Sequence, residues 1–273
     1  MQSLKDWVEA VEARPRATAT RTLINPREAA KDSGSGCFNG LLDNEQFAWI
    51  KLPNSPHGAR ALANDVIINR FMRSVNAPTP TAELVRVSAD LFNAWRTPAQ
   101  WYGQPIRLHH DLIGHASYHV PTAIESKINH FEHHTDDDNA NRQALLAAMW
   151  DLFAGFDDQW LYDAANDHSI WSFDHGLWLY TEASDWTPDL LQRKVSEPNE
   201  RPDDELLSPD ALEVAAVGLS TVTHEQILNA ICAVPVEWQI PNYDLGVLGW
   251  FINTRLPDVI SRLYQRAETI RKR

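Results

Sequence analysis

The sequence predicts an α+β protein built in two lobes, with a small antiparallel sheet and one helix in residues 15–120 and a mostly helical part in residues 121–273. Short segments with alternating apolar residues dominate the first part, whereas longer stretches with helical spacing of apolar residues dominate the second. A polar stretch at residues 121–140 separates the two patterns. Strands followed by helices are typical of an α+β architecture, and we expect the whole chain, 1–273, to form a single domain.

The composition narrows the class of protein. Of the 273 residues, 44% are hydrophobic and 22% charged, which is enough to bury a sizeable core. The net charge of −13 makes general nucleic-acid binding unfavourable, because most of the surface would repel a phosphate backbone. Two distant cysteines, the acidic residues near the N-terminus and the absence of a long apolar run favour a cytoplasmic protein with no membrane segment.

The first part of the chain begins with a helix at residues 3–13, where Ser3 and Asp6 form a possible capping pair. The segments expected after it are a strand at 17–24, a glycine-containing loop at 31–40, a hairpin at 41–52 that turns at Asp43–Asn44, a helix at 61–75 and a strand at 82–88. These assignments follow from alternation in the strands and helical spacing in the helix. They place one helix between strands of a small sheet.

In the second part, residues 121–140 read as an exposed connection and residues 142–155 as a strongly apolar helix. A short hairpin is expected at Trp160–Tyr162 and Ile170–Phe173. The Pro- and acid-rich segment 196–210 is expected to be a loop, and helices are expected at 223–233 and 244–270.

Lys51 stands in the otherwise apolar strand FAWIKL, and the simplest interpretation is an edge-strand lysine facing water. Its neighbours in sequence order indicate a second interpretation. Gly34 and Gly36 lie in the loop before it, and Asp65 lies on the helix after it. In phosphoryl transfer a strand lysine holds nucleotide phosphates, a helix carboxylate orients the lysine, and a glycine loop covers the phosphates with backbone N–H groups.

Asp174 follows the apolar segment Ile170–Phe173 directly and precedes His175 and Gly176. It could begin a surface turn, or it could supply the hard oxygen ligand that Mg²⁺ prefers. Asp157 and Asp158 lie at the end of an apolar helix, where the helix dipole disfavours acids. Both are therefore candidates for the group that accepts the proton of a substrate hydroxyl.

Histidines are dense between residues 109 and 134, and Asp136, Asp137 and Asp138 follow them. No HExxH pattern occurs there. We interpret HFEHHTDDD as a solvated insert rather than a transition-metal site.

Several segments resemble the HipA-like kinases, a bacterial group with the protein-kinase-like fold. GSGCFNGLLDNEQFAWIKL is similar to the first strands of that family, and ALANDVIINRFMRSVNAPTP to its following helix. LIGHASYHVP, which contains Tyr118, resembles a segment near the lobe junction. The stretch MWDLFAG…WLYD…IWSFDHG resembles the catalytic region, and its Asp-His-Gly is the most specific part. The resemblance covers about residues 20–265.

The resemblance implies an ATP- and Mg²⁺-dependent kinase that phosphorylates serine or threonine of a protein. Lys51 and the glycine loop would then hold ATP, with Asp65 in place of the usual helix Glu and Tyr118 as a further ATP contact. Asp174 would bind Mg²⁺, and Asp157 would be the catalytic base.

The chain departs from the family pattern in the segment 155–163. Asp158 replaces the usual Arg, and Tyr162 stands where one alignment expects a metal-binding Asn. An alternative alignment gives Gln159 that position, and Asp163 could also supply an oxygen. An active kinase, a pseudokinase that binds nucleotide or protein, and an unrelated α+β protein therefore all stay open, as does a protein partner.

Overall fold

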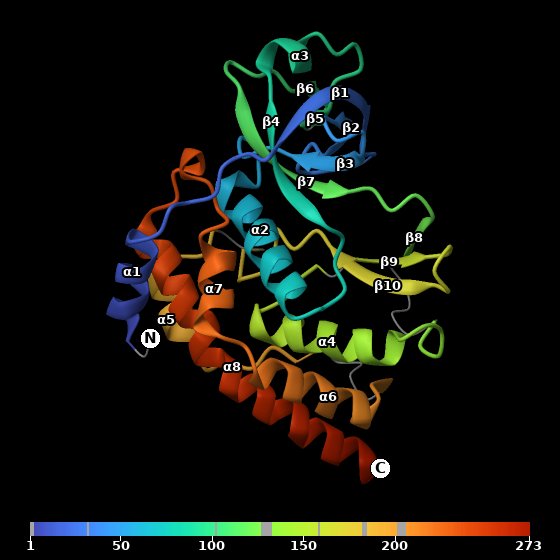
Figure 1. Cartoon of the computed structure of the whole chain (residues 1–273), viewed down its shortest axis with the longest axis vertical. Helices are drawn as coiled ribbons and strands as arrows, with labels where there is room; N and C mark the ends of the chain where they lie inside the picture. Colours follow the sequence, from blue (N-terminus) through green and yellow to red (C-terminus); the bar gives the residue numbers. More distant parts are fainter. Residues whose placement is uncertain are drawn as a thin grey trace.

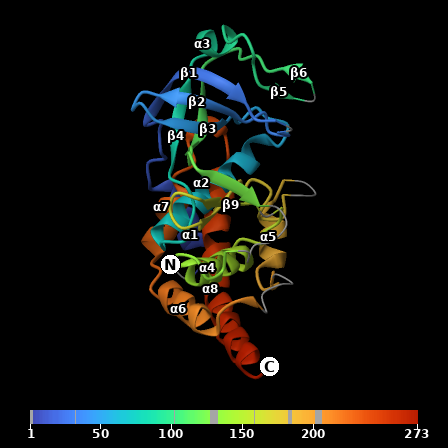
Figure 2. The ribbon, with the colours of Figure 1, turned by 90° about the vertical axis from the view of Figure 1, so that its right-hand side faces the viewer.

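The computed structural model describes residues 3–31, 33–101, 103–126, 133–157, 159–181, 185–200 and 206–273. A β-barrel occupies one end of the molecule and helices occupy the other, with α2 between them (Figure 1). The view turned by 90° shows the same arrangement, with the C-terminal end of α8 farthest from the barrel (Figure 2). The expected mixture of strands and helices is therefore confirmed.

The barrel contains five strands in the closed order β1-β2-β3-β7-β4. Their bounds are β1 Arg21–Ala29, β2 Phe38–Leu42, β3 Phe47–Lys51, β4 Ala82–Val87 and β7 Leu112–Tyr118. Four of the pairings are antiparallel, but β1 and β4 pair in parallel. The prediction of a purely antiparallel sheet was therefore wrong, because closing this barrel brings its first and fourth strands together in the same direction.

Additional elements surround the barrel. Helix α2 (Gly58–Ser74) follows β3 and agrees with the helix predicted from the apolar spacing. Between β4 and β7 lie the short helix α3 (Ala89–Asn93) and the two-residue strands β5 (Gln100–Trp101) and β6 (Gln104–Pro105). This segment carries Trp101 toward the glycine loop.

The helical part contains α4 Asn139–Leu152, α5 Pro188–Lys194, α6 Pro209–Ser220, α7 His224–Ile231, the 3-10 turn Val236–Trp238 and α8 Asn242–Arg271. Helix α1 (Leu4–Glu12) packs against α8. The packing is close, since a Cβ added at Gly246 of α8 would lie 2.7 Å from Val8 Cα. The predicted Ser3–Asp6 capping box is present at the start of α1.

A second sheet has the order β10-β9-β8, with bounds β8 Ala123–Ser126, β9 Gln159–Asp163 and β10 Ser169–Phe173. The predicted hairpin is confirmed as β9 and β10. The exposed connection predicted at 121–140 is partly wrong, because it contains β8 and the first residues of α4. Helix α6 was not predicted, and the expected strand at 17–24 begins only at Arg21.

The hydrophobic core consists of two clusters of buried side chains. One fills the barrel and includes Phe38, Ile50 and Phe92. The other extends from α2 through the helices and includes Phe71, Phe153 and Phe251. The proposed lobe boundary between residues 120 and 121 stays a prediction. No helix in the described ranges combines the length and the apolarity that a membrane crossing requires.

Candidate functional site

Lys51 lies between two carboxylates from distant parts of the chain. Its Nζ atom donates a hydrogen bond to Asp65 Oδ2 on α2 at 2.8 Å and forms a second ion pair with Asp174 Oδ1. The exposed fraction of the side chain is 14% for Lys51, 4% for Asp65 and 32% for Asp174. The alternative of a lysine facing water is therefore wrong, because its ammonium group is largely buried and paired twice.

The strand period explains the position of this lysine. Ile50 is fully buried in the barrel core, so Lys51, the next residue of β3, projects from the opposite face of the barrel wall. Lys51 pairs across the strand with His115 of β7. Asp65 comes from the middle of α2, and Asp174 follows the last residue of β10.

Electrostatics keep Lys51 and Asp65 charged near neutral pH. Burial alone lowers the pKa of Lys51, but the negative charges of Asp174 and Asp65 outweigh burial and raise its pKa above the ordinary value. Burial raises the pKa of Asp65, but the positive charge and hydrogen bond of Lys51 outweigh it, so this pKa lies below its ordinary value. The pair is thus held as an ammonium and a carboxylate.

Asn64 fixes the chain that follows Asp174. Its side-chain amide nitrogen lies within hydrogen-bonding distance of Gly176 O at 3.0 Å, Trp178 O at 2.9 Å and Thr181 Oγ1 at 2.9 Å. Its oxygen accepts a bond of 2.9 Å from Trp186 Nε1. Because Asn64 immediately precedes Asp65 on α2, one helical turn orients the lysine and holds the loop that carries the second carboxylate.

The Asp-His-Gly segment is itself closely packed. Asp174 has a positive φ of 56°, a conformation that bends the chain sharply after β10. His175 Nε2 lies 3.0 Å from Ser172 Oγ, and burial lowers the pKa of this imidazole to about 4. A Cβ at Gly176 would lie 3.4 Å from Ala61 O, so the loop passes directly against α2. The interpretation of Asp174 as a simple surface turn is therefore insufficient.

The segment after α4 brings Asp157 and Gln159 to the end of the β9–β10 hairpin at which Asp174 follows β10. Gln159, the first residue of β9, pairs with Phe173, the last residue of β10, and Asp174 follows directly. Gln159 Nε2 donates a bond of 3.4 Å to Asp157 Oδ2, and Asp157 has a φ of 50°. Asp157 and Gln159 thus lie on the Asp174 side of the hairpin. Asp158 lies outside the described residues.

Asp163 lies at the other end of that hairpin. It pairs with Ser169, so it is separated from Gln159 by the full length of β9. Its carboxylate accepts hydrogen bonds from Thr122 Oγ1, from Asn166 Nδ2 at 2.5 Å and from the backbone N–H of Ala165 at 3.1 Å. The structure does not bring Asp163 to Asp174.

The glycine loop between β1 and β2 is held by the segment that carries β5. Gly36 has a φ of 65°, and a Cβ there would lie 2.4 Å from Trp101 Nε1. That indole donates a bond of 3.2 Å to Ser35 O. A Cβ at Gly34 would lie 3.0 Å from His57 Nε2 just before α2, so the loop reaches the start of that helix.

Tyr118 has a different environment from the other predicted ATP contacts. It pairs with Ala48 of β3, three residues along β7 from His115. Its hydroxyl accepts hydrogen bonds from Asn44 Nδ2 at 2.8 Å and from Arg21 Nε at 3.4 Å. The structure therefore places Tyr118 against the barrel core rather than beside Lys51.

Comparisons with known proteins give a likeness of fold only. No protein-family model and no curated protein matches the chain. Among solved structures, the proinflammatory kinase CtkA of Helicobacter pylori matches with a TM-score of 0.57 and 10% identity, covering 94% of this chain and 99% of that one. A Golgi casein kinase matches with a TM-score of 0.54 and 9% identity over 97% of this chain and 77% of its own. The same kind of kinase with Mn and ADP bound matches with a TM-score of 0.51, 10% identity and coverage of 97% and 76%.

The chain has a kinase-like fold. The expected HipA-like membership stays a prediction, since identities of 9–10% carry the fold and not the family. In this kinase-like fold the Lys51 cluster lies where the barrel meets the helical part.

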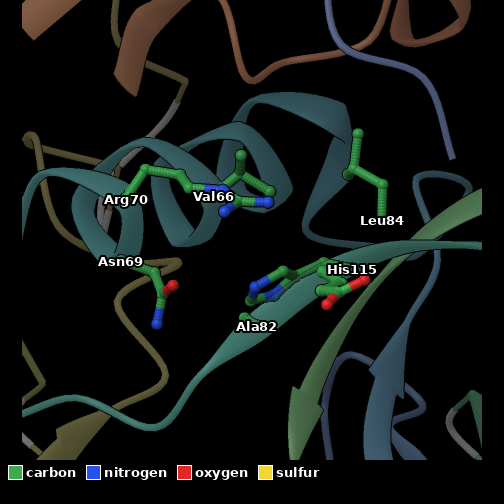
Figure 3. A pocket seen from close by; sticks show the side chains of 7 residues that line it. Val66, Asn69, Arg70, Ala82, Leu84 and His115 are labelled. Carbon is green, nitrogen blue, oxygen red and sulfur yellow. The ribbon is translucent and has the colours of Figure 1, made fainter. Parts of the chain in front are cut away.

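A small pocket lies between α2 and the strands β4 and β7 (Figure 3). It is lined by Val66, Asn69, Arg70, Ala82, Glu83, Leu84 and His115. Two buried polar atoms at this pocket, Asn69 Oδ1 and His115 Nε2, have no hydrogen-bond partner in the structure. Burial lowers the pKa of His115 to about 4, so the imidazole that pairs across the strand with Lys51 is neutral near neutral pH.

Sequence reasoning missed Asn64 and His115. Asn64 could have been suspected, because its spacing from Ile67 and Phe71 puts a polar residue on the apolar face of the predicted helix. His115 offered no comparable signal, because its importance comes from its cross-strand pairing with Lys51.

Proposed function

We propose that this chain is an ATP- and Mg²⁺-dependent phosphotransferase, namely a serine/threonine protein kinase of the HipA-like family. The observation that carries the proposal is the double pairing of Lys51 with Asp65 and Asp174. In protein kinases a strand lysine pairs with a helix carboxylate, and a separate aspartate binds the metal. The barrel with α2 (residues 15–120) and the helical part (residues 121–273) would be the two lobes.

The available groups fit a nucleotide with a divalent cation. The Lys51 ammonium suits phosphate oxygens, while the Asp174 carboxylate and the Gln159 amide oxygen are hard ligands that suit Mg²⁺. One of the similar solved structures, the Golgi casein kinase, is described with Mn and ADP bound. Mg²⁺ would neutralise charge on the phosphates. The loop of Gly34 and Gly36 would cover the phosphates with its backbone.

In the proposed reaction, Asp157 accepts the proton of the substrate hydroxyl. Its positive φ and its hydrogen bond with Gln159 hold the carboxylate near the segment that carries Asp174. Asp163 is not included among the metal ligands, because its carboxylate is engaged by Thr122 and Asn166 at the far end of β9. We further propose that the chain is cytoplasmic and that its substrate is a protein.

One observation favours a second candidate, a pseudokinase that binds nucleotide without transferring phosphate. With Asp157 assigned as the base, the metal ligand left on the Asp174 side of the hairpin in the described part of segment 155–163 is the neutral amide of Gln159, which also bonds Asp157. A neutral ligand attracts Mg²⁺ less strongly than a second carboxylate would. The two candidates differ in catalysis but share the nucleotide site.

Two measurements on the same variants separate these candidates. The first is the shift of the unfolding temperature on adding ATP and Mg²⁺, and the second is transfer of label from γ-labelled ATP to the protein itself or to a lysate protein. The wild type is expected to show both. Asp174→Asn should lose both, and Asp157→Asn should keep the thermal shift but lose transfer.

Asp189→Asn is the matched control, because this exposed aspartate lies in the first turn of α5 and is not part of the Lys51 cluster. It should behave as the wild type. A wild-type thermal shift without transfer would replace the kinase by the pseudokinase. No shift with ATP would rule out both.

A further inference from the structure

A second cluster of potential metal ligands lies away from the Lys51 site. His133, Asp136 and His168 each present one ligand atom, and these atoms all lie within 4.8 Å of one another. His133 Nδ1 is 2.8 Å from Asp136 Oδ2, and His168 Nδ1 is 3.7 Å from the same oxygen. Both imidazoles thus direct the same ring nitrogen toward one carboxylate oxygen. This is the one such cluster among the described residues.

The two imidazole rings are held in parallel. Their centroids are 4.0 Å apart and their planes differ by 1°. The edge of His133 also packs against the ring of Tyr162 at 4.7 Å between centroids. Stacking places both Nδ1 atoms on the side of Asp136, but the lone pair of each nitrogen lies in its own ring plane and parallel planes do not meet. One ring therefore has to rotate about its χ2 angle, a broad torsion in histidine, for both nitrogens to bind the same ion.

A buried asparagine joins the backbones that carry the histidines. Asn139 is fully buried, and its amide nitrogen donates to His133 O at 2.8 Å and to His168 O at 2.9 Å. Its oxygen accepts a bond of 2.8 Å from the backbone N–H of Ile170. This residue is a positioning group, because it holds the segment before α4 against the turn between β9 and β10.

We propose that His133, Asp136 and His168 form a binding site for a divalent transition metal, with Zn²⁺ as the expected ion. Two imidazoles and one carboxylate are the donor set that zinc accepts, whereas Mg²⁺ and Ca²⁺ prefer oxygen ligands alone. Zinc bonds of roughly 2.0–2.2 Å to nitrogen and oxygen place tetrahedral ligands about 3.4 Å apart. The observed separations of 2.8 and 3.7 Å lie on either side of this value.

With three protein ligands, a water molecule would complete a tetrahedral site. Both histidines would bind through Nδ1, so the metal would replace the hydrogen bond between His133 Nδ1 and Asp136 Oδ2. The metal would join the turn of the β9–β10 hairpin to the start of α4. The other end of that hairpin carries Gln159 and leads into Asp174, so metal binding would stabilise the element that positions both residues.

The sequence analysis favoured a solvated insert for this region. That interpretation considered the histidines up to residue 134 and the aspartates that follow them, whereas the completing ligand, His168, comes from a separate turn. His133 and Asp136 alone would be an ordinary hydrogen-bonded pair.

The test is calorimetric titration of the full chain, after treatment with EDTA, with zinc chloride. The wild type should bind one Zn²⁺ per chain at this site. His133→Ala and His168→Ala should each weaken that binding by at least about tenfold. Asp136→Asn keeps the side-chain volume and should weaken it as well, which covers the case in which an alanine variant unfolds. Cobalt(II) gives a second readout, because its visible absorption reports the ligand set and should change in the same three variants.

Two controls locate the binding. His109→Ala removes an exposed histidine outside the cluster, and Asp174→Asn alters the kinase-like site; both should bind Zn²⁺ as the wild type does. Loss of binding in His109→Ala, unchanged binding in His168→Ala, or no saturable binding by the wild type would each overturn the proposal. Because the readout is metal binding, it is independent of any phosphotransferase activity.

Discussion

The ammonium of Lys51 and the carboxylate of Asp174 form an ion pair although the residues are 123 positions apart in the sequence. Asp65 completes the cluster from α2. Three elements therefore meet at the largely buried ammonium of Lys51: strand β3, helix α2 and the loop after the β9–β10 hairpin.

Removing the charge of Lys51 should destabilise the fold. In Lys51→Met, the 4% exposed carboxylate of Asp65 loses its partner, and breaking a buried ion pair costs about 3–5 kcal/mol of unfolding free energy. Urea denaturation measures this loss. The double variant Lys51→Met/Asp65→Asn should recover part of it, because no unpaired buried carboxylate remains on α2.

Lys31→Met is the matched control for that series, since Lys31 is exposed, and it should change the unfolding free energy by less than about 0.5 kcal/mol. A Lys51→Met variant as stable as the control would show that the ion pairs contribute nothing.

Replacing Asn64 should release the Asp-His-Gly loop. Asn64→Leu has a similar volume but removes the donor for Gly176 O and Trp178 O, and each buried unsatisfied group costs about 1–3 kcal/mol. The expected result is a lower unfolding free energy together with weaker binding of ATP, measured by urea denaturation and by titration with ATP. Asn229→Leu, on the exposed face of α7, removes only an exposed hydrogen bond from Arg14, so it should change the unfolding free energy by less than about 0.5 kcal/mol and leave ATP binding unchanged. Unchanged ATP binding in a folded Asn64→Leu protein would contradict the positioning role.

Two glycine-to-alanine variants allow the free-energy cost of backbone strain to be measured separately from the cost of a steric clash. Gly36 and Gly103 both have positive φ, but a Cβ at Gly36 would lie 2.4 Å from Trp101 Nε1, whereas nothing lies within 4 Å of a Cβ at Gly103. Gly103→Ala should therefore cost only the backbone term, about 1–2 kcal/mol. Gly36→Ala should cost more than Gly103→Ala in thermal unfolding and should also weaken ATP binding. Equal losses of stability in the two variants would mean that the Trp101 side chain moves away from the added Cβ at no measurable cost in free energy.

Stability should fall as the pH falls from 6.5 to 4. Burial lowers the pKa of His115 and His175 to about 4, against 6.5 for an ordinary histidine. In this window the unfolded chain binds protons at both positions and the folded chain does not. The unfolding free energy therefore decreases with decreasing pH, by up to about 1.4 kcal/mol per pH unit for each histidine.

The histidine contribution is isolated by comparing variants, since carboxylates also titrate in this range. The slope of unfolding free energy against pH should be smaller in His175→Asn than in the wild type. His110→Asn, at an exposed position, should keep the wild-type slope. A slope that is identical in all three proteins would place the acid sensitivity elsewhere.

Local patterns were sufficient for α2, the β2–β3 hairpin and the β9–β10 hairpin, because each depends on the period of apolar residues within a short segment. They failed for α6 and for β8. Helix α6 was obscured by the preceding Pro- and acid-rich segment, although Ser208 caps it and Pro209 begins it. Strand β8 exists because its backbone pairs with β9, and a four-residue strand has no strong pattern of its own.

The sequence by itself determined that Lys51 would lie in an apolar strand, that Asp65 would lie on the next helix, and that Asp174 would follow a buried strand. Only the tertiary structure decided that these three charges meet, that Asp163 lies apart from them, and that β1 closes the barrel against β4 in parallel. The spacing of apolar residues indicates which secondary structure a short segment of the chain adopts. Contacts between distant segments depend on how helices and sheets pack, and side chains such as Asn64, which hold those segments together, acquire their role only when the partners are in place.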